Sequence, residues 1–154
     1  METENEAESK IKLVKQMSPL TWAYLGDSIF ETYIRDYLVD TTNLKPNKLH
    51  RKAIMYVKAK AQADVIKKLD AYLTDEEKDI VKRTRNTENH HVPKNADKAD
   101  YMYSTAFEGL IGYLYLTKQE ERLAEILKLS IEIHNNSQII RPLGQAVKTQ
   151  PSQG

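Results

Sequence analysis

The chain has 154 residues, a formal net charge of +1 and no cysteine. This length suits a single domain, and the lack of cysteine excludes disulfides and thiolate metal sites. The N-terminal segment is acidic and lacks the apolar core of a secretory signal. The most apolar run, Ser104 to Thr117, is too short to cross a bilayer. We therefore expect a soluble, cytoplasmic protein with no membrane partner.

Charge is unevenly distributed along the chain. Residues 45–63 contain six Lys or Arg and no acid, and a second basic cluster covers Lys82, Arg83 and Arg85. Acids gather instead at the N-terminus and in Asp75–Asp79. Such separation can give a neutral protein one basic face that binds a polyanion, although long basic helices can equally be solvated surfaces.

The apolar spacing is helical throughout and predicts one all-α domain. Residues 1–9 are expected to be disordered, and the folded domain to cover residues 10–135. Ser18-Pro19 has the form of an N-cap followed by proline at the first helical position, which predicts a helix to about Val39. Lys45-Pro46 opens a second helical stretch, which runs to about Leu73 with a break near Val57.

The second half of the chain continues the helical pattern. Thr74-Asp75-Glu76-Glu77 has the form of a capping box and predicts a helix that ends near Arg85. Residues 86–96 are polar and aperiodic and predict a loop. Two further helices are expected, at about Asp97 to Lys118 and Gln119 to Asn135. The tail at 136–154, which contains proline and glycine, is expected to be flexible.

Two acids are predicted on the apolar side of the first long helix. Asp27 and Glu31 lie one turn apart on a stripe that also contains Leu20, Tyr24 and Ile34. Acids in such a position are costly unless a cation, a basic partner or a helix N-terminus compensates them. The alternative is a stripe that is only partly buried, on which both acids form ordinary salt bridges.

A third acid, Glu108, is the only charge in the apolar run at 104–116. Gly109 and Gly112 follow it, and each costs roughly 1 kcal/mol relative to alanine inside a helix. Such a cost indicates a close backbone approach, for which Gly26 could be the matching surface. If the helices cross there, Asp27 and Glu108 would meet, and a hard cation such as Mg²⁺ would relieve their repulsion. A bond to a helix N-terminus or to a buried arginine is the alternative for Glu108.

These residues resemble a known family. Tyr24-Leu25-Gly26-Asp27-Ser28-Ile29-Phe30-Glu31 resembles the signature of the ribonuclease III catalytic domain, whose core is L-G-D-[AS]-[VI]-x-E. Phe107-Glu108-Gly109-Leu110-Ile111-Gly112 resembles the second element of the same family, and the order and the separation of the two motifs also fit. The short chain, with no RNA-binding domain after the motifs, is similar to the compact bacterial branch of this family.

The resemblance implies an all-α homodimer that cleaves double-stranded RNA with Mg²⁺, which Mn²⁺ can replace. It also implies products with 5′-phosphate and 3′-hydroxyl ends and, in this branch, maturation of large-subunit (23S) ribosomal RNA precursors. Asp27 and Glu108 match two acidic metal ligands of the family. The family places further acids four residues before the first and three before the second, where this chain has Ala23 and Thr105.

The remaining candidate residues surround this pair. Tyr24, Glu31 and Asp97 are expected to support it, although Asp97 could equally be an acid favoured at a helix N-terminus. The residues expected to contact RNA are His50, Lys52, Lys60, Arg83, Arg85, Asn86 and Lys94. Two alternatives remain: a non-catalytic RNA-binding or ribosome-assembly module that kept the fold, and a helical protein-interaction domain.

Overall fold

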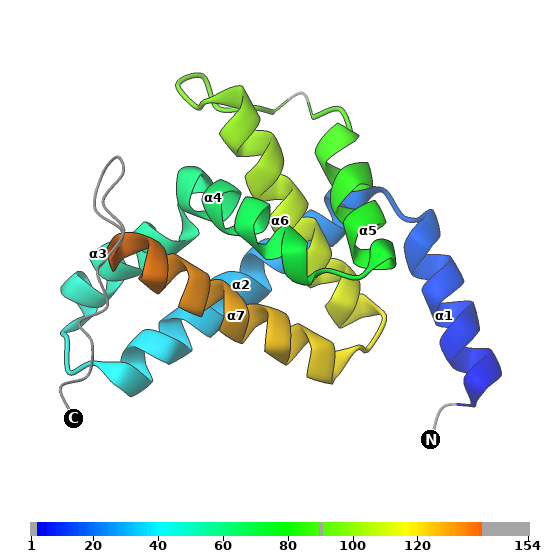
Figure 1. The fold of residues 1–154 in the computed structure, drawn as a ribbon, viewed down its shortest axis with the longest axis horizontal. Coiled ribbons are helices and arrows are strands. Elements are labelled where there is room, and N and C mark those ends of the chain that lie inside the picture. The colour runs from blue at the N-terminus through cyan, green and yellow to red at the C-terminus, as the bar shows by residue number, and fades with distance from the viewer. Residues whose placement is uncertain (1–2, 90, 140–154) are drawn as a thin grey trace, which may run out of the picture.

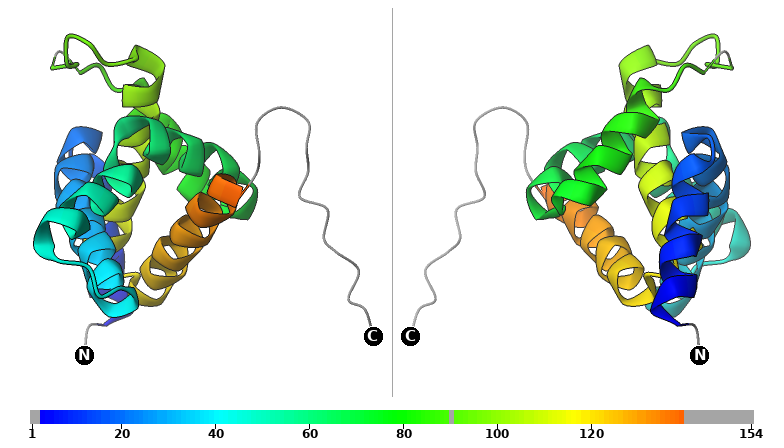
Figure 2. Two further views of the ribbon diagram at one scale, coloured as in Figure 1. Left: turned by 90° about the vertical axis from the view of Figure 1, so that its left-hand side faces the viewer. Right: turned by 90° about the vertical axis from the view of Figure 1, so that its right-hand side faces the viewer.

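A computed structural model describes residues 3–89 and 91–139 of the chain, and within these ranges it contains helices and no strand (Figures 1 and 2). The all-α prediction is therefore confirmed. None of the described helices has the length and apolarity needed to span a membrane. The helices are α1 (Glu4–Gln16), α2 (Pro19–Thr41), α3 (Pro46–Val57), α4 (Ala59–Leu69), α5 (Asp75–Asn86), α6 (Lys98–Leu116) and α7 (Glu120–Ile139), with a 3-10 turn at Asp70–Tyr72.

Local capping chemistry sets the helix starts that the sequence indicated. The Ser18 hydroxyl accepts a hydrogen bond from the Leu20 amide at 3.3 Å and caps α2. At α5 the Thr74 hydroxyl accepts from the Glu77 amide at 3.1 Å, while the Glu77 carboxylate accepts from the Thr74 amide at 2.9 Å. Lys58 has an extended backbone and separates α3 from α4, at the break expected near Val57.

The structure corrects the expectation at both ends of the domain. Residues 1–9 were expected to be disordered, but α1 begins at Glu4 behind a capping box formed by Thr3 and Glu6. The acids in its first turn complement the helix dipole, which favours helix in a segment that has no apolar stretch. At the other end α7 extends past Asn135 to Ile139, and the rest of the expected tail lies outside the described residues.

Helix α6 is the centre of the molecule and packs against α2, α4, α5 and α7 (Figures 1 and 2). Aromatic side chains fill the space between α6 and α2. The Phe30 and Phe107 rings meet edge to face with centroids 4.8 Å apart, and the Trp22 and Tyr113 rings do so at 5.4 Å. All four side chains are buried, so they fix α2 against α6 along most of the shared length.

Glycine allows α2 and α6 to touch along their backbones. A Cβ atom on Gly26 would overlap the carbonyl oxygen of Glu108 and lie 2.9 Å from the amide nitrogen of Gly112. A Cβ atom on Gly112 would overlap the carbonyl oxygen of Trp22. The crossing predicted from Gly26 and Gly112 is therefore confirmed, whereas Gly109 lies against Thr84 of α5 instead.

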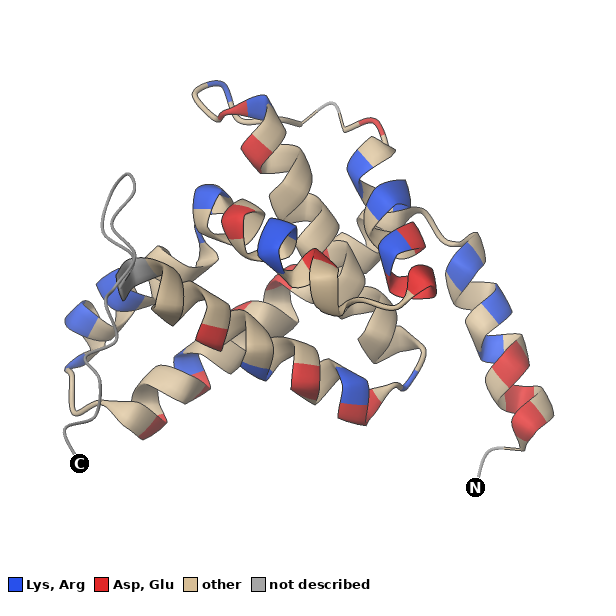
Figure 3. Cartoon of the chain, in the orientation of Figure 1, with Lys and Arg blue, Asp and Glu red and all other residues tan. Residues whose placement is uncertain are grey.

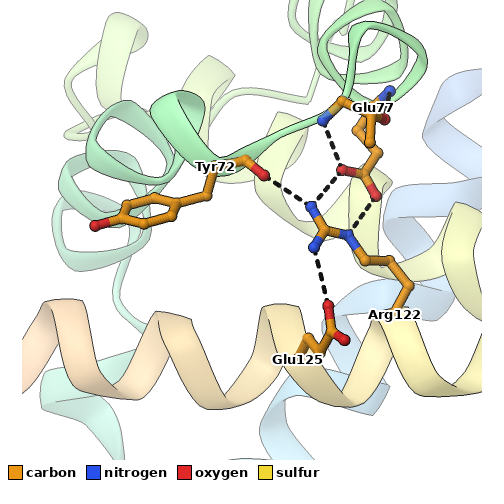
Figure 4. Close-up of polar contacts among 5 residues, drawn as sticks. Tyr72, Glu77, Arg122 and Glu125 are labelled. Carbon is orange, nitrogen blue, oxygen red and sulfur yellow. Dashed lines mark hydrogen bonds and ion pairs between the residues drawn. The ribbon is translucent and has the colours of Figure 1, made fainter.

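An ion pair joins the start of α5 to α7 (Figure 4). The Arg122 guanidinium donates to both carboxylate oxygens of Glu77 at 2.8 Å, to the Tyr72 carbonyl at 2.8 Å and to Glu125 at 3.0 Å. Burial disfavours the charged form of Glu77, but the bonds from Arg122 and from Thr74 outweigh it and lower the pKa of this carboxyl. The Glu77 carboxylate thus caps α5 and holds α7 at the same time.

Replacement of Gly26 by alanine should destabilise the protein, since no side-chain rotation can relieve contact between a Cβ and a backbone carbonyl. We expect the free energy of unfolding to fall by about 2 kcal/mol or more, although alanine in an unhindered helix would raise it by ~1 kcal/mol. Denaturant unfolding measures the change. Gly109→Ala is the matched control with a smaller loss, because its Cβ would meet only side-chain atoms of Thr84. A Gly26→Ala variant as stable as the parent would contradict the crossing.

Candidate active site

The crossing of α2 and α6 brings Asp27 and Glu108 together. Asp27 follows Gly26 directly, and Gly26 lies against the main chain of Glu108. The Asp27 side chain is exposed, while that of Glu108 is partly buried between the helices. The two carboxyl groups are close enough to share a hydrogen bond. One acid therefore faces outward and the other forms the floor of the site.

Electrostatics in this pair favour a bound proton or a bound cation. Burial, a hydrogen bond with Asp27 and repulsion from its charge raise the pKa of Glu108 to about 9. In the absence of metal, Glu108 therefore keeps its proton at neutral pH. A divalent cation would relieve both the burial cost and the repulsion, and its binding would release that proton.

The described residues supply only two acids to this site. No group of three or more Asp, Glu, His or Cys side chains arranged to hold a metal occurs among them. Ala23 and Thr105, which replace the further acids of the family pattern, are both buried. The Thr105 hydroxyl donates to the Tyr101 carbonyl at 2.9 Å within α6. Oxygen ligands beyond Asp27 and Glu108 would have to come from water or substrate.

The expected apolar stripe of α2 is only partly buried, which is the alternative that the sequence left open: Ile34 is buried, whereas Tyr24 and Asp27 are not. Tyr24 is 84% exposed and Asp27 is exposed, because Gly26 must face α6 and this turns its neighbours outward. Glu31 forms an ion pair with Arg35 at 2.8 Å, which is the ordinary salt bridge left open above. Glu31 and Tyr24 therefore border the site without joining the acid pair.

An open hollow of about 520 Å³ follows the outer side of α2 beside Asp27. All of its lining residues come from this helix, so it is a surface groove and not an enclosed pocket. The lining residues are Tyr24, Leu25, Asp27, Ser28, Glu31, Thr32 and Arg35. A polymer can reach Asp27 along this groove.

Most of the residues expected to contact RNA lie on exposed positions. Figure 3 shows Lys and Arg on α3, α4 and the second half of α5, whereas α7 and the start of α5 carry acids. His50 and Lys52 of α3, Lys60 of α4, and Asn86 and Lys94 in or beside the α5–α6 loop are exposed. Of these, Lys60 forms an ion pair with Asp64 at 3.7 Å. Basic residues thus predominate on α3, α4 and the second half of α5, whereas α7 carries both acids and bases.

Two predicted residues have structural partners instead. The Arg83 guanidinium donates to the Lys15 carbonyl at 3.0 Å and lies 5.1 Å from the centroid of the Trp22 ring. Arg83 therefore helps to hold the end of α1 on the body. Asp97 is the N-cap of α6 and accepts a hydrogen bond from the Asp100 amide at 2.9 Å. This is the helix-terminal role that the sequence left open for Asp97.

One basic residue that shares an aromatic contact with a predicted RNA-binding residue was not among those expected from the sequence. Lys67 of α4 lies 4.6 Å from the centroid of the Tyr103 ring, and the Arg85 guanidinium lies 5.6 Å from the same ring. Two cations from different helices therefore share one aromatic side chain of α6. The seven-residue spacing of Lys60 and Lys67, which places both on one helix face, was the available signal.

Comparison with known proteins decides the family. Residues 20–119 match the family model described as the ribonuclease III domain. The chain belongs to the ribonuclease III family, in its mini-ribonuclease III branch. The Mini-ribonuclease 3 of Enterococcus faecalis is 50% identical over 120 residues, which cover 77% of this chain and 91% of the relative. That of Staphylococcus aureus is 45% identical over 134 residues, covering 86% and 98%.

A solved structure shares the fold of this mini-ribonuclease III. The crystal structure of a Fusobacterium nucleatum protein matches with a TM-score of 0.69 and 33% sequence identity, over 77% of this chain and 95% of that chain. The protein is accordingly an endoribonuclease of the family that acts on double-stranded RNA. The non-catalytic and protein-interaction alternatives are not supported by these relationships.

Glu108 should make the metal-free protein less stable as pH rises. Its pKa of about 9 lies above the ordinary value of 4.5, so the folded state keeps a proton that the unfolded state releases between these values. Residue 108 cannot ionise in a Glu108→Gln variant. In EDTA near pH 8 its Tm should exceed that of the parent, by roughly 4 °C for each kcal/mol by which the free energy of unfolding is higher. Glu121→Gln, at an exposed position on α7, is the control. Parallel Tm–pH curves for parent and Glu108→Gln would contradict the shifted pKa.

Proposed function

We propose that Asp27 and Glu108 together hold a Mg²⁺ ion with which this enzyme hydrolyses the phosphodiester backbone of duplex RNA. The observation that carries the proposal is the backbone contact of Gly26 with Glu108, which brings the two acids together at the helix crossing; the raised pKa of Glu108 supports it. All-oxygen ligation suits Mg²⁺, and Mn²⁺ accepts the same ligands. When bound, the ion supplies a Lewis acid that stabilises charge on the phosphate and favours deprotonation of water.

The chain's own residues have distinct tasks in this reaction. Glu108, partly buried on a rigid glycine-packed helix, fixes the position of the site, and exposed Asp27 faces the scissile phosphate. Because Ala23 and Thr105 supply no carboxylate, further oxygen ligands for the ion would come from water and from phosphate oxygens of the RNA. In-line attack by water then leaves a 5′-phosphate and a 3′-hydroxyl.

The exposed basic residues suit the backbone of an A-form duplex, which proteins recognise mainly by shape. His50, Lys52, Lys60 and Lys94 are the proposed phosphate contacts, with Asn86 at the start of the loop that reaches a groove. Large-subunit (23S) ribosomal RNA precursors in the cytoplasm are the proposed substrate. Arg85 contributes together with Lys67 through the shared Tyr103 ring.

We also propose that two copies pair through the C-terminal part of α2, beyond the groove that leads to Asp27. Val39 is 65% exposed, which places a large apolar side chain on this surface. A groove with Val39, Leu49 and Pro46 among its lining residues continues this surface between α2 and α3. A two-fold axis through it would set one site against each RNA strand.

Asp27→Asn should remove cutting without unfolding the protein, because Asp27 is exposed. We expect the rate of duplex cleavage with Mg²⁺ to fall at least about a hundredfold, an increase in barrier of ~2.7 kcal/mol. Gel analysis of a labelled duplex measures it. Asp40→Asn, an exposed acid on the same helix, should cut at the parental rate. Parental cutting by Asp27→Asn would show that the metal site lies elsewhere.

Val39→Asp should separate the proposed dimer, since it places a charge in the apolar centre of the contact. Sedimentation velocity should show a dimer for the parent and a monomer, or a dimer weakened at least tenfold, for the variant. Tyr72→Asp is the control, because Tyr72 is similarly exposed at 58% but lies away from α2. A parental chain that sediments as a monomer at micromolar concentration would refute this contact.

A further inference from the structure

A small cavity lies where the junction of α3 and α4 meets α7, and it shares no residue with the groove at Asp27. Its volume is about 120 Å³. At ~30 Å³ for each water, about four waters would fill it, so it suits a single tetrahedral oxyanion and is too small for a nucleoside. We call it the α4–α7 pocket; its lining residues are Met55, Lys58, Lys60, Ala61, Asp64, Val65, His134 and Ser137.

His134 is the unusual group in this pocket. It is only 7% exposed, and its ring packs on Tyr56 with centroids 4.4 Å apart. Its ring nitrogens make no hydrogen bond to any described residue, whereas the adjacent Asn135 bonds to both Tyr56 and Tyr37. No side-chain polar atom among the described residues is both sealed and unpaired. A His134 nitrogen that is unpaired among the described residues therefore keeps some solvent access, and His134 lines the pocket, where a ligand can bind it.

The other polar groups of the pocket favour an anion. Lys58 and Lys60 both line it, and α4 begins between them at Ala59 with no side-chain cap. Unpaired amides in a first helical turn attract negative charge. Asp64 is the only acid in the lining and pairs with Lys60 at 3.7 Å. Two cations thus face one acid.

Ser137 adds no charge to the pocket, and its hydroxyl group already has two partners. Its hydroxyl donates to the Ile133 carbonyl at 2.7 Å and accepts from the Lys68 ammonium at 2.6 Å.

Burial and the charge of Lys58 lower the pKa of His134, against an opposing effect of Asp64. The imidazole is therefore neutral at pH 7, with one N–H to donate, and a bound anion would also stabilise its charged form.

We propose that the α4–α7 pocket binds a phosphate group, held by the His134 ring, the Lys58 and Lys60 ammonium groups and the free amides at the start of α4. The phosphate belongs either to the RNA backbone outside the catalytic groove or to free inorganic phosphate. The pocket shares Lys60 with the proposed RNA contacts but shares no residue with the acid pair, so the pocket can fail while the metal-site proposal stands.

Titration of the full chain with inorganic phosphate at constant ionic strength tests the pocket. Imidazole NMR should show a saturable change in the His134 signals, and Lys58→Met/Lys60→Met should weaken the affinity at least tenfold. Both lysines are exposed, so the fold should survive, as circular dichroism can verify. Lys12→Met/Lys128→Met removes the same charge at exposed positions elsewhere and should bind as the parent does.

A second titration, with duplex RNA in EDTA so that no cutting occurs, identifies the source of the phosphate. If the RNA backbone enters the pocket, RNA shifts the His134 signals and inorganic phosphate competes with it. If free phosphate is the ligand, RNA leaves these signals unchanged while phosphate moves them. His134 signals that respond to neither ligand, or equal phosphate affinity of the parent and Lys58→Met/Lys60→Met, would overturn the proposal.

Discussion

The contact between the backbones of α2 and α6 is the constraint on which the rest of the structure depends. Gly26 and Gly112 remove the side chains that would keep these helices apart, so that carbonyl and amide groups of one helix meet the other. Aromatic rings of both helices close over the contact. The same crossing decides which side chains point into the core, which reach the surface, and where Asp27 meets Glu108.

That geometry creates an electrostatic conflict which the enzyme can use. A partly buried carboxyl beside a second acid holds its proton at neutral pH, and a divalent cation relieves the conflict. The surrounding fold is held by other polar contacts, including the Arg122–Glu77 pair and the Arg83 contact with α1. These contacts are separate from the acid pair.

Prediction from the sequence was most accurate for features that residues close together in the chain determine. The caps at Ser18 and Thr74 placed two helix starts, because a hydroxyl bonds to amides two or three residues away. It was weaker for the predicted stripe of α2, in which Ile34 is buried but Tyr24 is exposed. Apolar spacing alone cannot distinguish these faces when aromatic residues lie on both.

The sequence by itself determined the all-α class, most helix boundaries and the family motifs with Asp27 and Glu108. Short-range capping, helical periodicity and glycine spacing carry that information. Only the tertiary structure decided that Arg83 binds the end of α1 and that Lys67 and Arg85 share the Tyr103 ring. These outcomes depend on contacts between helices far apart in the chain, which no local pattern encodes.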